Sequence, residues 1–315
     1  MLKTAESVTP LHPDKICDRI SDTILDECLK QDPDTRAAIE TMGGHNIITV
    51  TGELTTKAFV NIPFLVRELY GDVGVQVNIS QQSPKIAQGV DTGGAGDQGI
   101  MIGYACSENT DMVPQEYYLA RKLAQYLYKY YEQDGKTQVT LTDDNKVKVV
   151  ASFCCSSTDK LEYMCKKFFR KQKYEIDTLH CNPSGEWDIG GFDADTGLTG
   201  RKLAVDNYGP RVPLGGGAFS GKDATKVDRS GAYMARKIAV DYLKKYNADE
   251  VMVRLAYAIG YNEPLESTVI VDGTPSIIKG YDLSPNSIIK TLDLKKPIYS
   301  KTAEWGHMGN NFNWK

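Results

Sequence analysis

The sequence lacks any long uninterrupted apolar segment. Its first fifteen residues, MLKTAESVTPLHPDK, contain no apolar core of the kind a secretory signal peptide needs. No apolar run reaches the roughly 20 residues of a transmembrane helix. We therefore expect a cytoplasmic protein that does not insert into a membrane.

The sequence also has little excess charge of either sign. The formal net charge is −4, and the densest basic segment, KKFFRKQK at residues 166–173, fits the solvated face of a helix. A nucleic-acid-binding surface would show a larger basic excess. We therefore expect no nucleic-acid partner.

Motifs of zinc sites and disulfide frameworks are missing. None of the seven cysteines forms a C-x-x-C pair, although Cys154 and Cys155 are adjacent, and the four histidines are scattered. Structural zinc sites need clustered Cys and His ligands. We expect reduced thiols and no zinc site.

One order of predicted elements occurs three times. The first unit reads as helix 13–31, strands RAAIET and NIITVTGEL, helix IPFLVRELYG and strand VGVQVNI. The same order returns from residue 114 and again from residue 226. Further strands, GIMIGYAC and RKLAVDNY, precede the second and third long helices, so each unit is close to β-α-β-β-α-β. We predict an α+β fold of three similar domains, at residues 1–92, 93–187 and 188–315.

The segment GGGAFSGKD, residues 215–223, nearly matches a phosphate-binding P-loop. A P-loop ends in a Ser or Thr that ligates magnesium, whereas this segment ends in Asp223. A P-loop also follows a strand directly, and here GPRVPL intervenes. Other glycine-rich turns, GGAGDQG at 93–99 and TGLTGRK at 196–202, offer backbone N–H groups and nearby cations to phosphates.

Several carboxylates accompany these turns. Asp14, Asp18 and Asp22 are spaced by four and share one helix face, which could bind a cation or face water. Asp14 and Asp228 also stand where helix caps are common. Two such carboxylates meeting at phosphates would instead suit Mg²⁺.

Together these segments resemble methionine adenosyltransferase (S-adenosylmethionine synthetase). The shared segments follow the family's order over nearly the whole chain and include HPDKICDRISD, QSPKIAQGVD, GAGDQG, TGLTGRK and GGGAFSGKDATKVDRS. The resemblance implies three similar α+β domains about a pseudo-threefold axis. It also implies synthesis of S-adenosylmethionine from ATP and L-methionine, followed by hydrolysis of the triphosphate to pyrophosphate and phosphate.

The resemblance implies a role for each matching residue. The catalytic triphosphate contacts would be His12, Lys136, Arg201, Lys202 and Lys222. Further ATP contacts would be Asp134, Glu186, Trp187, Asp195 and Ala218, with Trp187 stacked on adenine. Methionine would be bound by Glu53, Gln82, Asp195 and Lys226. Asp14 and Asp228 would ligate Mg²⁺ and Glu40 would help to hold K⁺. Residues 82–94 match a mobile lid, and the active site would lie between two subunits of a homodimer.

This chain also departs from the family pattern. Leu11 replaces a glycine beside His12, Glu186 stands where a basic residue is common, and the lid and central unit are short. The chain ends soon after GHMGNNFNW, where relatives usually continue, so a dimer rather than a tetramer is expected.

Three other interpretations stay open at this point. A P-loop kinase would transfer phosphate and form ADP, a regulator would bind ATP or methionine without turnover, and a generic α+β scaffold would do neither.

Overall fold

The computed structural model describes residues 2–81, 93–142 and 144–315. Most of the expected lid, including Gln82, lies outside these ranges. Among the described residues, no helix combines the length and the apolar character needed to cross a bilayer.

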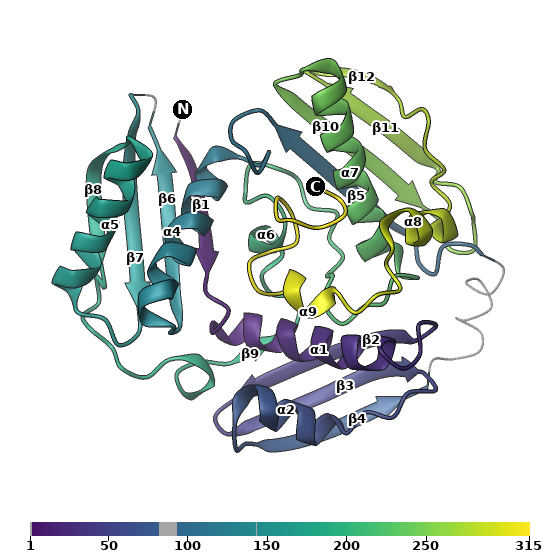
Figure 1. Cartoon of the computed structure of the whole chain (residues 1–315), viewed down its shortest axis with the longest axis horizontal. Helices are drawn as coiled ribbons and strands as arrows, with labels where there is room; N and C mark the ends of the chain where they lie inside the picture. The colour runs from purple at the N-terminus through teal and green to yellow at the C-terminus, as the bar shows by residue number, and fades with distance from the viewer. Residues whose placement is uncertain (1, 82–92, 143) are drawn as a thin grey trace.

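The described strands form three four-stranded sheets (Figure 1). In sheet order, the first contains β1 (Lys3–Val8), β6 (Gly135–Leu141), β7 (Lys146–Phe153) and β8 (Glu175–Cys181). The second contains β12 (Thr274–Ile277), β11 (Glu266–Val271), β10 (Glu250–Tyr257) and β5 (Gly99–Cys106). The third contains β4 (Gly74–Ser80), β3 (Ile47–Thr55), β2 (Arg36–Gly44) and β9 (Gly197–Leu198). The prediction of an α+β fold built on three units is confirmed.

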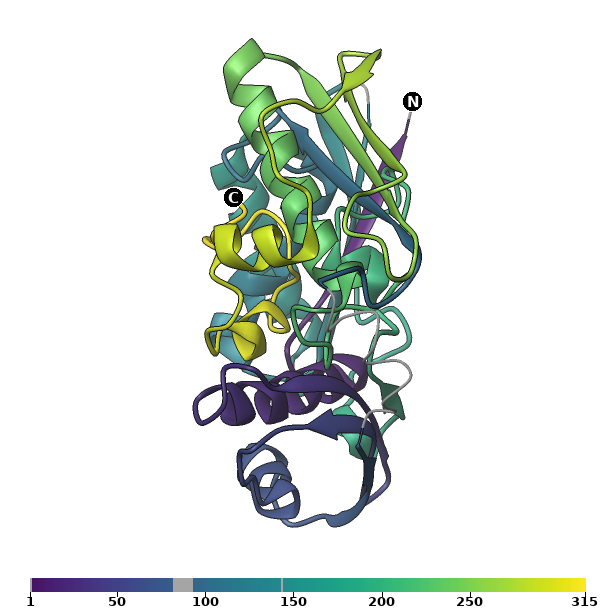
Figure 2. The ribbon, with the colours of Figure 1, turned by 90° about the vertical axis from the view of Figure 1, so that its right-hand side faces the viewer.

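Two helices that pack against each other accompany each sheet. The pairs are α1 (Pro13–Leu29) with α2 (Ile62–Tyr70), α4 (Gln115–Tyr131) with α5 (Thr158–Gln172), and α7 (Val227–Tyr246) with α8 (Pro285–Leu292). Figure 1 shows α1, α4 and α7 on the inner sides of their units, around a centre that holds α6 (Leu203–Asp206) and α9 (Tyr299–Thr302). A 3-10 turn, η1, covers Gly191–Asp193. In the perpendicular view, the C-terminal segment lies on one side of the molecule and strands β10 and β11 on the other (Figure 2).

Each sheet takes an edge strand from a distant part of the chain. β1 pairs with β6, β5 pairs with β10, and β9 pairs with β2, all antiparallel. GIMIGYAC is therefore a strand as predicted, but it belongs to the sheet of the C-terminal unit, beside β10, rather than to the sheet of the central unit. The ranges proposed for three contiguous domains stay a prediction, because the sheets draw strands from across them.

The prediction of a strand at RKLAVDNY was wrong. This segment contains the short helix α6 and turns, and the sheet of the C-terminal unit is instead completed by β12, which forms a hairpin with β11. Its apolar residues Leu203, Ala204 and Val205 are consecutive and do not alternate with polar residues. Ion pairs of Lys202 and Asp206 with side chains of α1 fix the segment instead.

The helix α1 shows why the local pattern was informative. His12 caps its start and Pro13 occupies the first turn. Ile16, Ile20 and Ile24 are buried on the side of the helix that packs against β2. Burying each such side chain contributes about 1.5–3 kcal/mol. This packing holds the other, carboxylate-bearing face of the helix toward the glycine-rich loops.

Candidate active site

A row of carboxylates on α1 anchors loops from distant parts of the chain. Backbone N–H groups donate to four aspartates spaced by four residues: Leu198 to Asp14 at 3.0 Å, Gly200 to Asp18 at 2.8 Å, Gly221 to Asp22 at 2.8 Å and Tyr299 to Asp26 at 2.9 Å. Asp18 and Asp22 are buried and pair with Lys15 and Arg229, so they do not face water. Asp14 and Asp18 thereby position the TGLTGRK loop, Asp22 positions the GGGAFSGKD loop, and Asp26 holds the start of α9.

Two glycines make this close approach possible. A Cβ at Gly197 would lie 2.2 Å from the carbonyl oxygen of Pro13, and a Cβ at Gly221 would lie 1.9 Å from that of Ile39. Gly221 also has φ +82°, which side chains disfavour. Glycine is therefore required where each loop meets its neighbouring backbone.

Asp14 is the centre of a first group of charges. Its side chain is 1% exposed, and Lys202 donates from Nζ to Oδ2 at 2.5 Å while Arg201 Nε lies 3.4 Å from Oδ1. Burial by itself raises the pKa of Asp14, but the hydrogen bonds from Lys202 and from the Leu198 N–H lower it below its ordinary value. Asp14 is therefore ionised at neutral pH.

His12 lies beside Asp14 and is neutral at physiological pH. Burial and the charge of Lys202 lower the pKa of His12 to about 4. Its Nδ1 accepts the N–H of Asp14 at 3.2 Å, so the neutral ring carries its proton on Nε2. The imidazole can therefore donate a hydrogen bond to an anion without carrying a positive charge.

Three further predicted residues surround this group. Asp134 accepts the N–H of Gly191 at 2.9 Å, and burial raises the pKa of Asp134. The exposed Asp195 acts electrostatically on both His12 and Asp134, and Lys136 acts on His12 while pairing with Glu6 at 2.7 Å. We call the resulting set the helix-start cluster: His12, Asp14, Asp134, Lys136, Asp195, Arg201 and Lys202.

A second group surrounds the GGGAFSGKD loop. Lys222 Nζ lies 2.6 Å from Asp228 Oδ2. Burial raises the pKa of Glu40 above its ordinary value, although the charge of Lys222 opposes this shift. Lys222 also bridges to Ala38 of β2, and Ala38 pairs with Glu53 of β3. We call this set the loop cluster: Glu40, Glu53, Ala218, Lys222, Lys226 and Asp228.

The contacts of Asp223 show that the GGGAFSGKD loop is not a P-loop. Its carboxylate accepts the N–H groups of Ala37 and Thr225, each at 2.8 Å, and pairs with Lys226 Nζ at 2.6 Å. These bonds tie the loop to β2, so Asp223 does not take the part of the metal-binding hydroxyl. In the sequence, the only sign of this structural role of Asp223 was that it replaces the Ser or Thr of a P-loop.

The two clusters lie at different places along α1. Asp14 is at its start, whereas Asp22, which holds Gly221 of the loop, is eight residues further on, or about 12 Å at 1.5 Å per residue. None of the ion pairs given above joins a residue of one cluster to a residue of the other. The two clusters are therefore separate groups of charges along the helix.

The residues expected at adenine lie in the central unit. Glu186 accepts the Thr158 N–H at the start of α5 at 2.7 Å, and the half-buried Trp187 accepts the Cys155 N–H at 2.8 Å through its carbonyl oxygen. A cleft is lined by Cys155, Ser156, Ser157, Glu186, Trp187 and Asp188. Because the Glu186 carboxylate caps a helix, its departure from the family pattern has a structural role.

Two buried ion-pair networks were not predicted. Lys15 Nζ lies 2.9 Å from Asp18 and 2.5 Å from Asp206, and Arg229 bonds Asp22 through both terminal nitrogens. The acid spacing on α1 was visible in the sequence. Asp206 is 191 positions from Lys15 and Arg229 is 207 positions from Asp22, so neither pairing carried a local signal.

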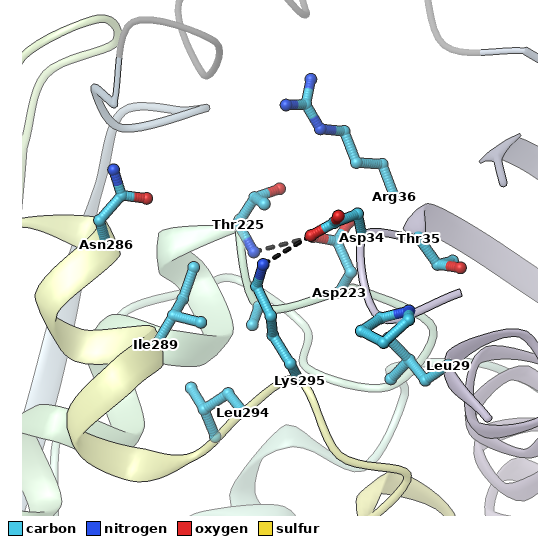
Figure 3. Close-up of a pocket in the computed structure, with 12 residues that line it drawn as sticks. Leu29, Asp34, Thr35, Arg36, Asp223, Thr225, Asn286, Ile289, Leu294 and Lys295 are labelled. Atoms are coloured by element: carbon cyan, nitrogen blue, oxygen red, sulfur yellow. Dashed lines mark hydrogen bonds and ion pairs between the residues drawn. The ribbon is translucent and has the colours of Figure 1, made fainter. Parts of the chain in front are cut away.

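A separate cavity of about 190 Å³ lies behind the GGGAFSGKD loop. Figure 3 shows Lys295 pointing to Asp34 at its rim, 2.5 Å apart, with Ile289 and Leu294 below. No residue of the helix-start or loop cluster lines it.

The fold and the two clusters define a three-unit α+β protein with paired cations and carboxylates suited to a polyanion and its metal ions. Comparison with models of known families identifies the family. The N-terminal, central and C-terminal domain models of S-adenosylmethionine synthetase match residues 1–92, 92–186 and 189–315.

Curated relatives match along nearly the full length. S-adenosylmethionine synthase of Brachyspira hyodysenteriae is 39% identical over 373 residues, covering 99% of this chain and 95% of the relative. The synthase of Mesoplasma florum is 40% identical over 364 residues, covering 100% and 97%. That of Clostridium tetani is 40% identical over 367 residues, covering 98% and 94%. The chain belongs to the S-adenosylmethionine synthetase family.

These alignments are longer than the chain itself. They span 364 to 373 residues although the chain has 315. The relatives therefore contain tens of residues, within the aligned span, that this chain lacks. That the shortening falls in the lid and the central unit stays a prediction.

Proposed function

We propose that the chain is a methionine adenosyltransferase that makes S-adenosylmethionine from ATP and L-methionine. The observation that carries the proposal is the occurrence of both charged clusters at the motifs of a family matched over the whole chain. A thioether sulfur is nucleophilic without deprotonation, so its attack on C5′ requires no general base. What it requires is stabilisation of the leaving triphosphate.

The cations of both clusters would supply that stabilisation. Lys202 and Lys222 are held by Asp14 and Asp228, and each ammonium would turn to a phosphate oxygen when the anion binds. His12 would donate through Nε2, with Arg201 and Lys136 as further phosphate contacts. The same groups would serve the hydrolysis of triphosphate to pyrophosphate and phosphate.

The carboxylates fit Mg²⁺ that is shared with the substrate. Among the described residues, no group of three or more His, Cys, Asp and Glu side chains could hold a metal alone. Mg²⁺ commonly takes one or two protein carboxylates and completes its shell with phosphates and water. Asp14 and Asp228 would hold it and Glu40 would help to hold K⁺; bound Mg²⁺ neutralises developing charge on the triphosphate.

The remaining predicted contacts concern adenine and methionine. Trp187 would stack on adenine, with Asp134, Glu186 and Ala218 near the nucleotide. Asp195 is exposed and would bind the ammonium of methionine, together with Glu53 and Lys226. Gln82 lies outside the described residues, so its part in methionine binding stays a prediction.

We further propose a homodimer in which one subunit's helix-start cluster faces the other's loop cluster. The separation of the two clusters along α1 supports this arrangement. Mixing inactive Lys202→Ala and Lys222→Ala subunits should restore activity, because a mixed dimer has one site with both lysines. A mixture that stays inactive despite demonstrated subunit exchange would contradict a shared site. Light scattering distinguishes the dimer from a tetramer, and the cytoplasmic location remains a prediction.

Product analysis tests the activity itself. Purified protein incubated with ATP, methionine, Mg²⁺ and K⁺ should yield S-adenosylmethionine, pyrophosphate and phosphate by chromatography and mass spectrometry. Formation of ADP and a phosphorylated acceptor would support a kinase instead. Binding of both substrates without turnover would support a regulator.

A further inference from the structure

Two adjacent cysteines lie in the turn after β7, at the edge of the cleft that contains Trp187. The Sγ atoms of Cys154 and Cys155 are 3.5 Å apart, and Cys155 is exposed whereas the other six cysteines are buried. The pair therefore combines one thiol that solvent reagents can reach with a second thiol in contact with it.

The backbone of this pair holds two segments in place. The Cys154 N–H donates to the carbonyl of Asp134 at 2.9 Å, and the Cys155 N–H donates to that of Trp187 at 2.8 Å. The Asp134 side chain in turn accepts the Gly191 N–H. The turn thus connects the residues proposed at adenine with the helix-start cluster.

We propose that Cys154 and Cys155 form a reversible thiol–disulfide modification site whose oxidation weakens ATP binding. The oxidant is a small disulfide, such as oxidised glutathione. The Cys155 thiolate attacks one sulfur of that disulfide, breaks its S–S bond and releases one thiol. The Cys154 sulfur then attacks Cys155 Sγ and releases the second thiol, so two protein thiols are oxidised and one disulfide is reduced to two thiols. The effect on ATP rests on the proposed function.

The order of the two attacks follows from the surroundings of each thiol. Burial and the neighbouring Cys155 raise the pKa of Cys154 to about 12, so Cys154 is a poor first nucleophile. Once Cys155 is in a mixed disulfide, its thiol no longer hydrogen-bonds Cys154. Cys154 then has an electrophilic sulfur within contact distance.

Closure of the ring must move the backbone. Consecutive Cα atoms are about 3.8 Å apart, whereas disulfides usually join Cα atoms roughly 4.4–6.8 Å apart. Cys155 already has φ +55°, so the turn is in a sparsely populated conformation before oxidation. Since both N–H groups of the pair are engaged, their bonds to Asp134 and Trp187 are the ones that oxidation disturbs. Strained disulfides are readily reduced, which makes the modification reversible.

The test uses the full-length protein treated with oxidised glutathione. We expect the peptide containing residues 154 and 155 to lose two hydrogens, and amides at 187–191 to exchange faster in hydrogen-exchange mass spectrometry. The KM for ATP should rise about two- to tenfold, the range that loss of one hydrogen bond supports. Dithiothreitol should reverse all three changes.

Cys155→Ser is the matched control, and each variant is compared with its own untreated form. Its treated and untreated forms should give the same KM and exchange rates. Glutathione that stays attached to Cys155, or a vicinal disulfide with unchanged KM and exchange, would overturn the proposal. Absence of S-adenosylmethionine synthesis by the untreated protein would refute the proposed function instead, while mass and exchange would still test the modification site.

Discussion

The buried pair of Asp22 and Arg229 gives a prediction whose size follows from the structure. Both side chains are 0% exposed, and two hydrogen bonds of 2.6 and 2.8 Å join them. Asp22→Asn keeps the shape of the side chain but leaves a buried guanidinium without its counter-charge. Removing one partner of such a pair costs about 3–5 kcal/mol, a large share of the roughly 5–15 kcal/mol that stabilises a typical protein.

Urea unfolding followed by circular dichroism, at one protein concentration, measures this loss. The exposed Asp72→Asn is the matched control and should change the free energy of unfolding by less than about 0.5 kcal/mol. The double variant Asp22→Asn, Arg229→Met should recover at least ~1 kcal/mol over Asp22→Asn, because no unpaired charge remains. Its turnover should stay low, since Arg229 no longer holds the Lys222 carbonyl. A loss below about 1 kcal/mol in Asp22→Asn would refute the reasoning.

Three further predictions concern the site. Lys222→Ala should lower kcat by about 100-fold or more while KM for ATP changes less, because its charge stabilises the leaving group; steady-state kinetics would show unchanged kcat if Lys222 has another role. Gly217→Ala should raise the Mg²⁺ concentration needed for activity, because the new Cβ would lie 2.3 Å from Asp228 Cγ; an unaltered Mg²⁺ titration would argue against Asp228 as a ligand. His12 should stay neutral in an NMR titration until the pH approaches its lowered pKa of about 4. Because the pKa of His12 is lower in the folded than in the unfolded protein, the free energy of unfolding should decrease as pH falls from about 6.5 to 4. The decrease should be smaller in His12→Asn, and a His12 that titrates near pH 6.5 would contradict its burial.

Local patterns predicted the elements and failed on their long-range pairing. The Ile16, Ile20 and Ile24 stripe identified α1 because its burial depends on helical spacing alone. The sheet that accepts GIMIGYAC depends on which edge is free in three dimensions, and its alternation of apolar residues carries no such information. RKLAVDNY was misassigned because ion pairs with Lys15 and Asp14 outweigh its weak strand preference.

Site residues were predictable where a motif is continuous and not where a contact spans the chain. GGGAFSGKD and TGLTGRK directed attention to Lys222 and Lys202. The pairing of Lys202 with Asp14 joins residues 188 positions apart, and only the structure shows it. The same holds for Glu186, whose role as a cap of α5 depends on where the chain returns after β8.

The bond broken in ATP tests the central claim most directly. ATP labelled with ¹⁸O at the oxygen that bridges C5′ and the α-phosphorus would be incubated with the protein, methionine, Mg²⁺ and K⁺. Attack of sulfur on C5′ predicts that the label leaves entirely with the released phosphate and pyrophosphate. Label retained in ADP or another adenosine phosphate would show cleavage of a phosphorus–oxygen bond, and would contradict adenosyl transfer.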